Sequence, residues 1–393
     1  MNQRQLPLIL LLQVVRMFMI TMPIIVIYWQ SHGLSMRDIF VLQVIFSIAI
    51  VVLEVPSGYF ADRFGRTTSI KLGSVAATVG YFAYWYFPMF WGFVLAEILL
   101  ALSVSFLSGA KEALLHESLD QSVRNRDNIK WQSRLFIAGN ISEATAAIAA
   151  SVVLIWYTLE TVLMLQWLIM ALTIPLAFFL YETRHTKDVP TPALVEILKG
   201  SFYRNKKLVA LNIYTAGFSA ATLCMVWFMQ PHWKFIGVDL VYFGYLWAGL
   251  NVVVALGASL ADRLEKRFLF RNLFLLSLLI LVSLYVAMTL LASSLWALLI
   301  APGFWLLRGI SFPIITDYVQ RESKDEEKAT VLSINKLGGR LVFSVASPFL
   351  GWLVDVYSFA TAFAASALIF GVICSLGVAT LYLTYLKPVS KVS

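Results

Sequence analysis

The fold is decided by residues 38–66, DIFVLQVIFSIAIVVLEVPSGYFADRFGR, in which a long apolar run ends in a short charged turn. A helix needs about 20 apolar residues to cross the hydrocarbon core of a bilayer, and this run is long enough. Of the chain's 393 residues, 60% are hydrophobic and 13% are charged, against about 45–50% and about 25% in soluble domains. This composition excludes soluble, secreted and disordered classes, and it indicates a protein that crosses the membrane many times.

Eleven further stretches resemble this run in length and apolarity, and none shows the alternation of membrane strands. The sequence therefore predicts an all-α membrane protein with twelve transmembrane helices. We expect two pseudo-symmetric six-helix bundles, residues 1–182 and 207–393, joined by a cytoplasmic linker, residues 183–206. Within that linker, residues 193–199 form a short amphipathic segment that could lie on the membrane surface. The predicted spans are 7–30, 38–60, 68–88, 91–116, 131–157, 161–181, 207–230, 240–261, 269–292, 295–319, 330–355 and 358–385.

The basic residues set the predicted orientation. The chain has 30 Lys and Arg residues and a net charge of +8. With the N-terminus in the cytoplasm, most of these residues fall in cytoplasmic loops and only Arg37 and Lys234 fall in loops on the far side. Because cytoplasmic loops carry an excess of Lys and Arg, this asymmetry predicts that both termini are cytoplasmic. The net charge is then an orientation signal, and no nucleic-acid partner is expected.

An internal repeat relates the two halves at an offset of 200 residues. Ala61-Asp62-Arg63 recurs as Ala261-Asp262-Arg263, in the same place after a predicted span. Several matches at one offset without gaps indicate a duplication rather than chance in an apolar alphabet. The other matched positions are Gln30 with Gln230, His32 with His232, Gly109 with Gly309, Glu117 with Asp317, and Gly139 with Gly339.

Residues 58–66 resemble the signature Gly-x-x-x-Asp-Arg/Lys-x-Gly-Arg of the major facilitator superfamily, and residues 108–119 resemble a fourth-helix pattern of bacterial members. The resemblance implies a monomeric secondary transporter in a bacterial cytoplasmic (inner) membrane, which moves a small molecule by alternating access between two related halves. It also implies that spans one, four, seven and ten line a central cavity, with contributions from five and eleven. The signature residues are Gly58, Asp62, Arg63, Gly65 and Arg66.

The chain also departs from that family's patterns. The second copy of the signature has Glu265 where the first has Gly65, and Thr67 stands where a basic residue often follows. The fifth span lacks the Gly- and Pro-rich motif of drug–proton antiporters, and the fourth lacks their arginine. These departures argue against a multidrug/proton antiporter. The multidrug antiporter stays an alternative, because aromatic residues make up 14% of the chain and there are 11 Met residues. A lipid-flipping protein is a more remote alternative.

The signature predicts a cytoplasmic gate. Gly58 and Gly65 permit a close approach of helices and loop, and Asp62 suits the positive N-terminal end of a facing helix. By resemblance, this contact latches the cytoplasmic side shut; the alternative is an ordinary charged turn. Further residues at that end are expected to join the gate or to form structural pairs: Arg63, Arg66, Glu54, Glu117 with Arg134, and Asp317 with Lys336.

Ionisable residues deep in the spans are costly and usually mark a pathway. Arg16, Arg308 and Arg340 fall near the midplane, and arginine binds carboxylate or phosphate through two hydrogen bonds. We therefore predict an anionic or zwitterionic organic substrate held by these three residues together with Gln13 and Asn140. Glu143, at the midplane, or Glu97, nearer the outer side, would carry a coupling proton, because burial favours the neutral form of a carboxyl group.

Each of these residues also has a structural explanation. Arg340 and Glu143 could form an ion pair, and Arg16 or Arg308 could bond backbone carbonyls near helix breaks at Pro23 and Pro313. The Ser and Thr stripes of the spans could hold helices together. The sequence contains no phosphate-binding loop and no hydrolase or metalloprotease motif, so we expect no enzyme activity, no cofactor and no metal. Cys224 and Cys374 both lie in apolar stretches.

Overall fold

A computed structural model describes residues 5–119, 124–182, 205–323 and 328–386. The described chain is helical and contains no strand, so the predicted all-α fold is confirmed. Ten helices in this part of the chain are long and apolar enough to cross a membrane. The predicted linker lies outside the described residues except for its last two, and so does its amphipathic segment. The side on which the termini lie stays a prediction.

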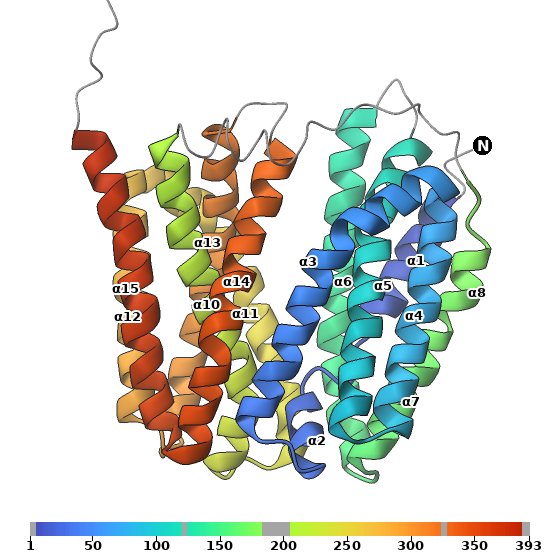
Figure 1. Ribbon diagram of the computed structural model, residues 1–393, viewed down its shortest axis with the longest axis horizontal. Helices are drawn as coiled ribbons and strands as arrows, with labels where there is room; N and C mark the ends of the chain where they lie inside the picture. The colour runs from blue at the N-terminus through green and yellow to red at the C-terminus, as the bar shows by residue number, and fades with distance from the viewer. Residues whose placement is uncertain (1–4, 120–123, 183–204, 324–327, 387–393) are drawn as a thin grey trace, which may run out of the picture. The chain divides into compact units, whose positions relative to one another are not determined.

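Two of the twelve predicted spans, the first and the third, are not among these ten helices. The first is divided into two short helices, α1 (Leu6–Met17) and α2 (Ile25–Ser31) (Figure 1). The third, α4 (Arg66–Tyr86), is long but rich in small and polar residues. These residues allow tight packing on the next helix, because a Cβ added to Gly73 would lie 2.8 Å from Leu107 Cδ1. The count of twelve spans therefore stays a prediction.

The remaining helices follow the predicted spans closely. The sixth span has a turn at Leu172, between α7 and α8. A short 3-10 helix, η3 (Leu240–Tyr242), leads into the eighth span. The helices are α3 (Met36–Phe64), α5 (Phe90–Ser118), α6 (Arg124–Leu154), α7 (Leu159–Ala171), α8 (Thr173–Phe178), α10 (Lys206–Phe235), α11 (Phe243–Arg267), α12 (Phe270–Leu290), α13 (Ala297–Arg321), α14 (Lys328–Val356) and α15 (Phe359–Leu386).

The chain forms two compact units. The first consists of residues 1–34, 41–188 and 238–249, so it contains most of the N-terminal half together with η3 and the start of α11. In it, α4 packs on α5 and α7, and α1 packs on α6 and α8. The second consists of residues 35–40, 189–237 and 250–393. Its α10 packs on α14 and α15, and its α12 packs on α13 and α15.

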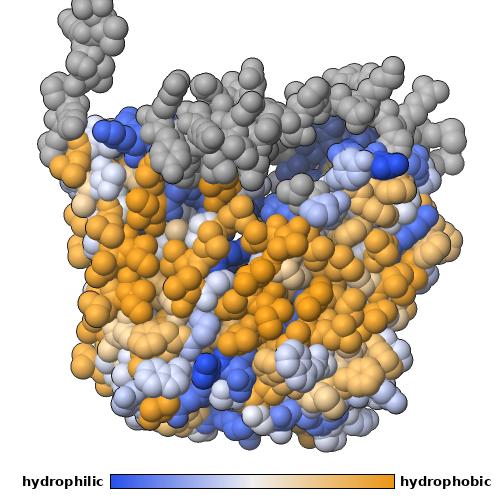
Figure 2. Space-filling model, in the orientation of Figure 1, coloured by the Kyte–Doolittle hydropathy of each residue, from blue (hydrophilic) through white to orange (hydrophobic). Residues whose placement is uncertain are grey.

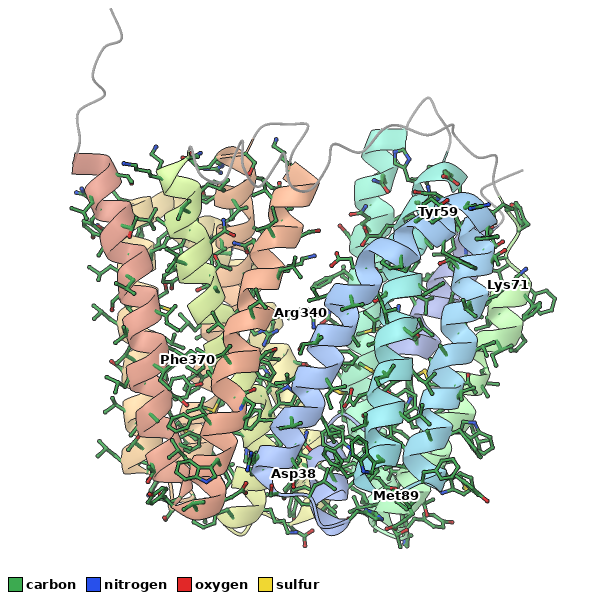
Figure 3. All side chains as sticks on the ribbon, viewed as in Figure 1. Asp38, Tyr59, Lys71, Met89, Arg340 and Phe370 are labelled. Atoms are coloured by element: carbon green, nitrogen blue, oxygen red, sulfur yellow. The ribbon has the colours of Figure 1, made fainter. Side chains whose placement is uncertain are left out.

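The first turn of α3 belongs to the second unit and has a complete set of hydrogen bonds. Ser35 and Asp38 form a capping box, in which the Ser35 amide donates to Asp38 Oδ2 and the Asp38 amide donates to Ser35 Oγ. The amides of Met36 and Arg37 both donate to the Asp355 carboxylate, each at 2.8 Å. Figure 3 labels Asp38 at this end of α3 and Tyr59 near the other. The amides that a helix start leaves unpaired are thus all satisfied by side chains.

The surface suits a hydrocarbon solvent. On the face shown in Figure 2, apolar side chains cover the long middle stretches of the helices, and hydrophilic ones gather towards the ends. In the second unit, Val345 is 81% exposed and Leu368 is 68% exposed. Such exposure is costly in water and favourable in a bilayer, where helices satisfy their own backbone groups.

Candidate functional site

The first unit brings two basic side chains close to each other, and one of them bonds an amide. Gln13 and Arg16 lie in the last turns of α1. From α5, Lys111 Nζ donates a hydrogen bond of 2.7 Å to Gln13 Oε1. Arg16 is close enough to Lys111 to interact with it electrostatically. On the other side of Gln13 stands Gly139 of α6, where an added Cβ would lie 2.9 Å from Gln13 Nε2. We call Gln13, Arg16 and Lys111 the cationic cluster.

Positive charge exceeds negative charge in the cationic cluster. Arg16 and Lys111 are both half-buried. Arg16 interacts electrostatically with the Tyr81 hydroxyl, and Lys111 interacts with Glu112, its exposed neighbour in sequence. Among the described residues, the structure shows no ion pair between either cation and a carboxylate. Two cations and an amide can bind the oxygens of a carboxylate or phosphate.

Lys111 was not predicted to join this cluster, because it lies towards the cytoplasmic end of the predicted fourth span. The available signal was its spacing: it follows Ser108, the first residue of the fourth-helix pattern, by three residues, which places both on neighbouring parts of one helix face. Its partner could not be read from the sequence, since Gln13 lies 98 residues away.

A second polar site surrounds Glu97 of α5, which is 4% exposed. Its Oε1 accepts two hydrogen bonds of 2.7 Å, one from Gln43 Nε2 of α3 and one from the Tyr84 hydroxyl of α4. Both donors are neutral, and no ion pair at Glu97 is seen in the described part of the chain. An ionised carboxylate with neutral partners is costly at such a site, whereas a protonated carboxyl group is tolerated.

Aromatic rings enclose the Glu97 site. The Tyr28 hydroxyl of α2 donates to the Tyr84 carbonyl oxygen at 3.0 Å. The rings of Trp29 and Phe93 each lie within 6 Å of the Tyr84 ring, centre to centre. All four aromatic residues are buried, Tyr84 being 2% exposed. The carboxyl group is therefore isolated from bulk solvent by packed rings.

The other predicted residues of the first unit have identifiable partners. Glu143 of α6 is half-buried, and its Oε1 accepts a hydrogen bond of 3.2 Å from Trp247 Nε1 at the start of α11. The Asn140 amide turns back on its own helix and donates to the Phe136 carbonyl at 2.8 Å. Two assignments stay predictions: that Glu143 carries a proton, and that Asn140 binds substrate.

Arg308 and Arg340, predicted to bind substrate, belong to the second unit. The Arg308 guanidinium lies 5.1 Å from the centre of the Phe312 ring, at the distance of a cation–π contact. Arg340 lies about midway along α14 (Figure 3). Both side chains are half-buried. Their assignment to the substrate site stays a prediction.

The gate residues of the first unit meet at Arg66. Its guanidinium lies 2.8 Å from Asp62 Oδ1 and 3.7 Å from Glu117 Oε1. The sequence paired Glu117 with Arg134, but Arg134 lies over the Trp131 ring at 4.9 Å. The pairing was wrong because Arg66, at the start of α4, approaches the end of α5 in space.

A carboxylate does occupy a helix N-terminus here, but it is that of Glu182 and not of Asp62. Glu182, just beyond α8, accepts hydrogen bonds from the amides of Arg66 and Thr67 at 2.8 and 2.9 Å, and from the Thr67 hydroxyl at 2.6 Å. Gly65 makes room for this contact, since an added Cβ would lie 2.7 Å from Glu182 Oε2. Its φ of +103° also lies where side chains are rarely tolerated.

The remaining signature residues show no such contact. No described atom lies within 4 Å of the position of a Cβ on Gly58. Arg63 donates to the Tyr59 hydroxyl at 3.0 Å, and Glu54 is exposed. The gate assignment of these residues stays a prediction.

The second unit contains an ion-pair network at related positions. Arg321 lies 2.9 Å from Glu265 and 2.6 Å from Asp317. The predicted pair of Asp317 with Lys336 was wrong, because Lys336 is exposed and Arg321 follows Asp317 by one helical turn. Glu265, which replaces the glycine of the first copy, thus supplies an acid to this network. In the first unit the shared cation comes from α4, whereas in the second it comes from α13.

The polar residues of α10 mainly serve packing. Asn335 Nδ2 of α14 donates to Asn212 Oδ1 at 2.8 Å, and both residues are buried. The Thr215 and Thr222 hydroxyls bond carbonyls of their own helix. Only the bond between Asn335 and Asn212 joins two helices, so it alone agrees with the alternative in which such stripes hold helices together.

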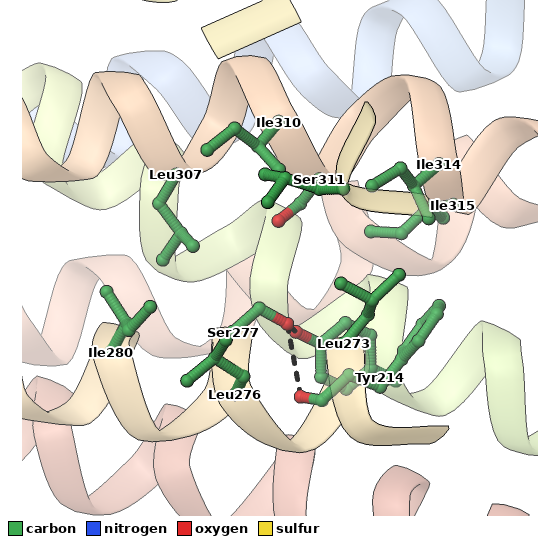
Figure 4. Close-up of a pocket in the computed structure, with 12 residues that line it drawn as sticks. Tyr214, Leu273, Leu276, Ser277, Ile280, Leu307, Ile310, Ser311, Ile314 and Ile315 are labelled. Atoms are coloured by element: carbon green, nitrogen blue, oxygen red, sulfur yellow. Dashed lines mark hydrogen bonds between the residues drawn. The ribbon is translucent and has the colours of Figure 1, made fainter. Parts of the chain in front are cut away.

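A small cavity of ≈ 80 Å³ lies among α10, α11, α12 and α13 (Figure 4). Its lining is apolar except for the hydroxyls of Tyr214, Ser277 and Ser311, and the first two bond each other. This cavity contains no charged side chain and does not suit an anion. Among the described residues, no three His, Cys, Asp or Glu side chains form a group that could hold a metal.

The comparisons with known proteins agree with this architecture. Residues 9–347 match the family model of the Major Facilitator Superfamily. The chain is 27% identical over 328 residues to YxaM of Bacillus subtilis (strain 168), described as an uncharacterized MFS-type transporter, and the match covers 80% of this chain and 79% of YxaM.

Solved structures show the same fold. The nucleoside transporter NupG superposes with a TM-score of 0.78 at 11% identity, covering 98% of this chain and 100% of NupG. A bacterial homologue of the human lysosomal transporter Spinster gives 0.73 at 15% identity, covering 97% and 96%. The D-xylose–proton symporter gives 0.72 at 16% identity, covering 99% and 97%.

The fold and the family match define the class: this is an integral membrane protein built as a transporter of small molecules. The chain belongs to the major facilitator superfamily. The resemblance of residues 58–66 to that family's signature is thereby confirmed.

Proposed function

We propose that this transporter moves a small organic anion, or a zwitterion with an exposed acidic group, by proton-coupled alternating access. The observation that carries the proposal is the cationic cluster, in which Lys111 bonds Gln13 and interacts with Arg16, and neither cation has an ion-paired carboxylate among the described residues. A cation at the centre of a membrane helix, such as Arg16, costs about 2.5–3.5 kcal/mol on insertion scales. A bound anion would offset that cost, which would explain why both charges are present at this site.

The comparisons support transport but leave the substrate open. The structural neighbours include a nucleoside transporter and a D-xylose–proton symporter, whose substrates differ in chemistry. At 11–16% identity these neighbours share the fold alone. The substrate class must therefore be inferred from the side chains of this chain.

Glu97 is the residue we propose for proton coupling. It is buried among neutral donors and aromatic rings, and it lies on α5, the helix that also carries Lys111. A carboxyl group so placed can bind and release a proton as its access to water changes between conformations. Glu143, which is half-buried and bonded to Trp247, is the second candidate.

The test is uptake into proteoliposomes with an imposed pH gradient. The probes are lactate, succinate and glycerol 3-phosphate as anions, and tetraphenylphosphonium and ethidium as lipophilic cations. We expect uptake of at least one anion and a loss of about tenfold or more in Arg16→Gln and Lys111→Gln. Transport of the cations alone, unaffected by these substitutions, would establish the multidrug alternative instead.

The matched control is Arg271→Gln. Arg271 is exposed at the start of α12, lies over the Tyr382 ring and belongs to the second unit, whereas the cationic cluster belongs to the first. The substitution Arg271→Gln removes the same charge as Arg16→Gln. Because Arg271 is not part of the cationic cluster, we expect uptake to stay unchanged. Equal losses in Arg16→Gln and Arg271→Gln would show that only net charge matters and would contradict the proposed site.

A further inference from the structure

The first span is broken at the centre of the predicted membrane segment. Helix α1 ends at Met17 and α2 begins at Ile25, with Pro23 in the intervening turns. Most of these residues are buried, with Thr21 2% exposed and Ile24 fully buried. Irregular backbone is tolerated at membrane depth only where protein or a water-filled cavity replaces the lost helix bonds. The side chains that replace them are therefore informative.

Several backbone groups lose their helical partners at the break, and three of them are informative. In a continuous helix the Phe18 amide would bond the Val14 carbonyl, but here it bonds Val15 at 3.2 Å. The Met22 amide likewise bonds Met19 rather than the Phe18 carbonyl. In the described part of the chain, the Thr21 amide bonds no backbone carbonyl. The Val14 and Phe18 carbonyls and the Thr21 amide thus need other partners.

Two side chains from other helices supply those partners. Ser142 Oγ of α6 donates to the Val14 carbonyl at 2.7 Å. Gln166 of α7 serves the other two groups at once: its Nε2 donates to the Phe18 carbonyl and its Oε1 accepts from the Thr21 amide, both at 3.3 Å. Gln166 is fully buried. A single glutamine side chain therefore joins the two ends of the broken backbone.

The break has an electrostatic consequence for Arg16. A helix carries about half a negative charge at its C-terminal end, and the effect is confined to the last turn. Arg16 lies in the last turn of α1. An unbroken first span would have no such end near the middle of the membrane. The break thus favours a cation at this position without a carboxylate that would compete with a bound anion.

We propose that Gln166 is a positioning residue, which holds the break in the first span and thereby keeps Arg16 at a helix C-terminal end, oriented to bind the anion. This inference rests on the proposed function. Gln166 itself contacts backbone rather than substrate. Ser142 assists from α6 by holding the last turn of α1.

The first test needs no substrate. In full-length protein in nanodiscs, amide hydrogen exchange of residues 18–24 should be at least tenfold faster in Gln166→Leu than in the wild type. The rate at which phenylglyoxal modifies Arg16 should change at least threefold. Ser142→Ala, which removes a single bond, should change both in the same direction by less. Gln132→Leu, at an exposed glutamine of α6, should change neither.

The second test separates positioning from folding. With the anion probe that the wild type transports, Gln166→Leu should raise KM at least tenfold while the maximal rate stays within twofold. In an Arg16→Gln background the same substitution should have no further effect, because the two residues act as a unit. Unchanged exchange and labelling, or effects of the two substitutions that add fully, would overturn the inference.

A failure of the proposed function would give a different result from a failure of the inference about Gln166. If the wild type transports none of the anions, the substrate proposal fails. The exchange and labelling results still decide whether Gln166 holds the break and Arg16.

Discussion

The two glycines of the signature should respond to alanine in opposite ways. Gly65 has φ +103° and ψ 148°, close to a region that is essentially restricted to glycine and costs other residues about 1–3 kcal/mol. A Cβ there would also displace the Glu182 carboxylate from the start of α4, and loss of a helix N-cap costs about 0.5–2 kcal/mol. Together these effects predict a loss of about 1.5–5 kcal/mol for Gly65→Ala.

Gly58 is the matched control. It lies within α3 and no described atom lies within 4 Å of its added Cβ. Alanine stabilises a helix interior by about 0.5–1 kcal/mol over glycine. Gly58→Ala should therefore be as stable as the wild type or slightly more stable.

The assay is thermal unfolding of purified protein in detergent, followed by tryptophan fluorescence. We expect a melting temperature several degrees lower for Gly65→Ala and unchanged or higher for Gly58→Ala. In a Glu182→Ala background, Gly65→Ala should cost less, because the cap is already absent. Equal stability of Gly65→Ala and the wild type, or equal losses at both glycines, would refute this reasoning.

Three further predictions follow from single contacts. Asp355→Ala should lower stability by about 0.5–2 kcal/mol in the same assay, because the Met36 and Arg37 amides lose their caps; no change would show that water replaces the carboxylate fully. Glu97→Gln should abolish the response of uptake to a pH gradient while anion exchange persists, and a retained pH response would move the proton site elsewhere. Arg321→Gln should leave Glu265 without its cation and change transport rate more than stability, because an exposed ion pair contributes about 0–1 kcal/mol; a large loss of stability with normal transport would contradict a gate role.

Much of the fold was predictable because the length of an apolar run is a local property of the sequence. The predicted spans coincide with helices, and the signature at residues 58–66 indicated the family. A helix break at Pro23 was raised only as an alternative explanation for Arg16, and the break raised beside it at Pro313 is absent, because α13 continues through that residue. Pro23 is the only local cue, and a single proline often only kinks a helix. The residue that holds the break, Gln166, lies 145 residues from Thr21.

The candidate site was predicted in part. Gln13 and Arg16, predicted as substrate-binding residues because a charge and an amide deep in an apolar span are costly, both lie in the cationic cluster; their role in binding stays a prediction. Lys111 was missed, and the partners of Glu117 and Asp317 were wrong, because ion pairs depend on which helix ends approach each other in space. The contacts of Glu182 with α4 and of Asp355 with α3 were not predicted either. Carboxylates outside apolar runs look like ordinary solvated charges in a sequence.

The most direct test of the central claim is the binding of an organic anion to the purified protein, measured by isothermal titration calorimetry at fixed ionic strength. Wild-type protein and Arg271→Gln should bind the transported anion with equal affinity. Arg16→Gln and Lys111→Gln should each weaken binding at least tenfold, which corresponds to about 1.4 kcal/mol. Undiminished binding by both variants would contradict the account.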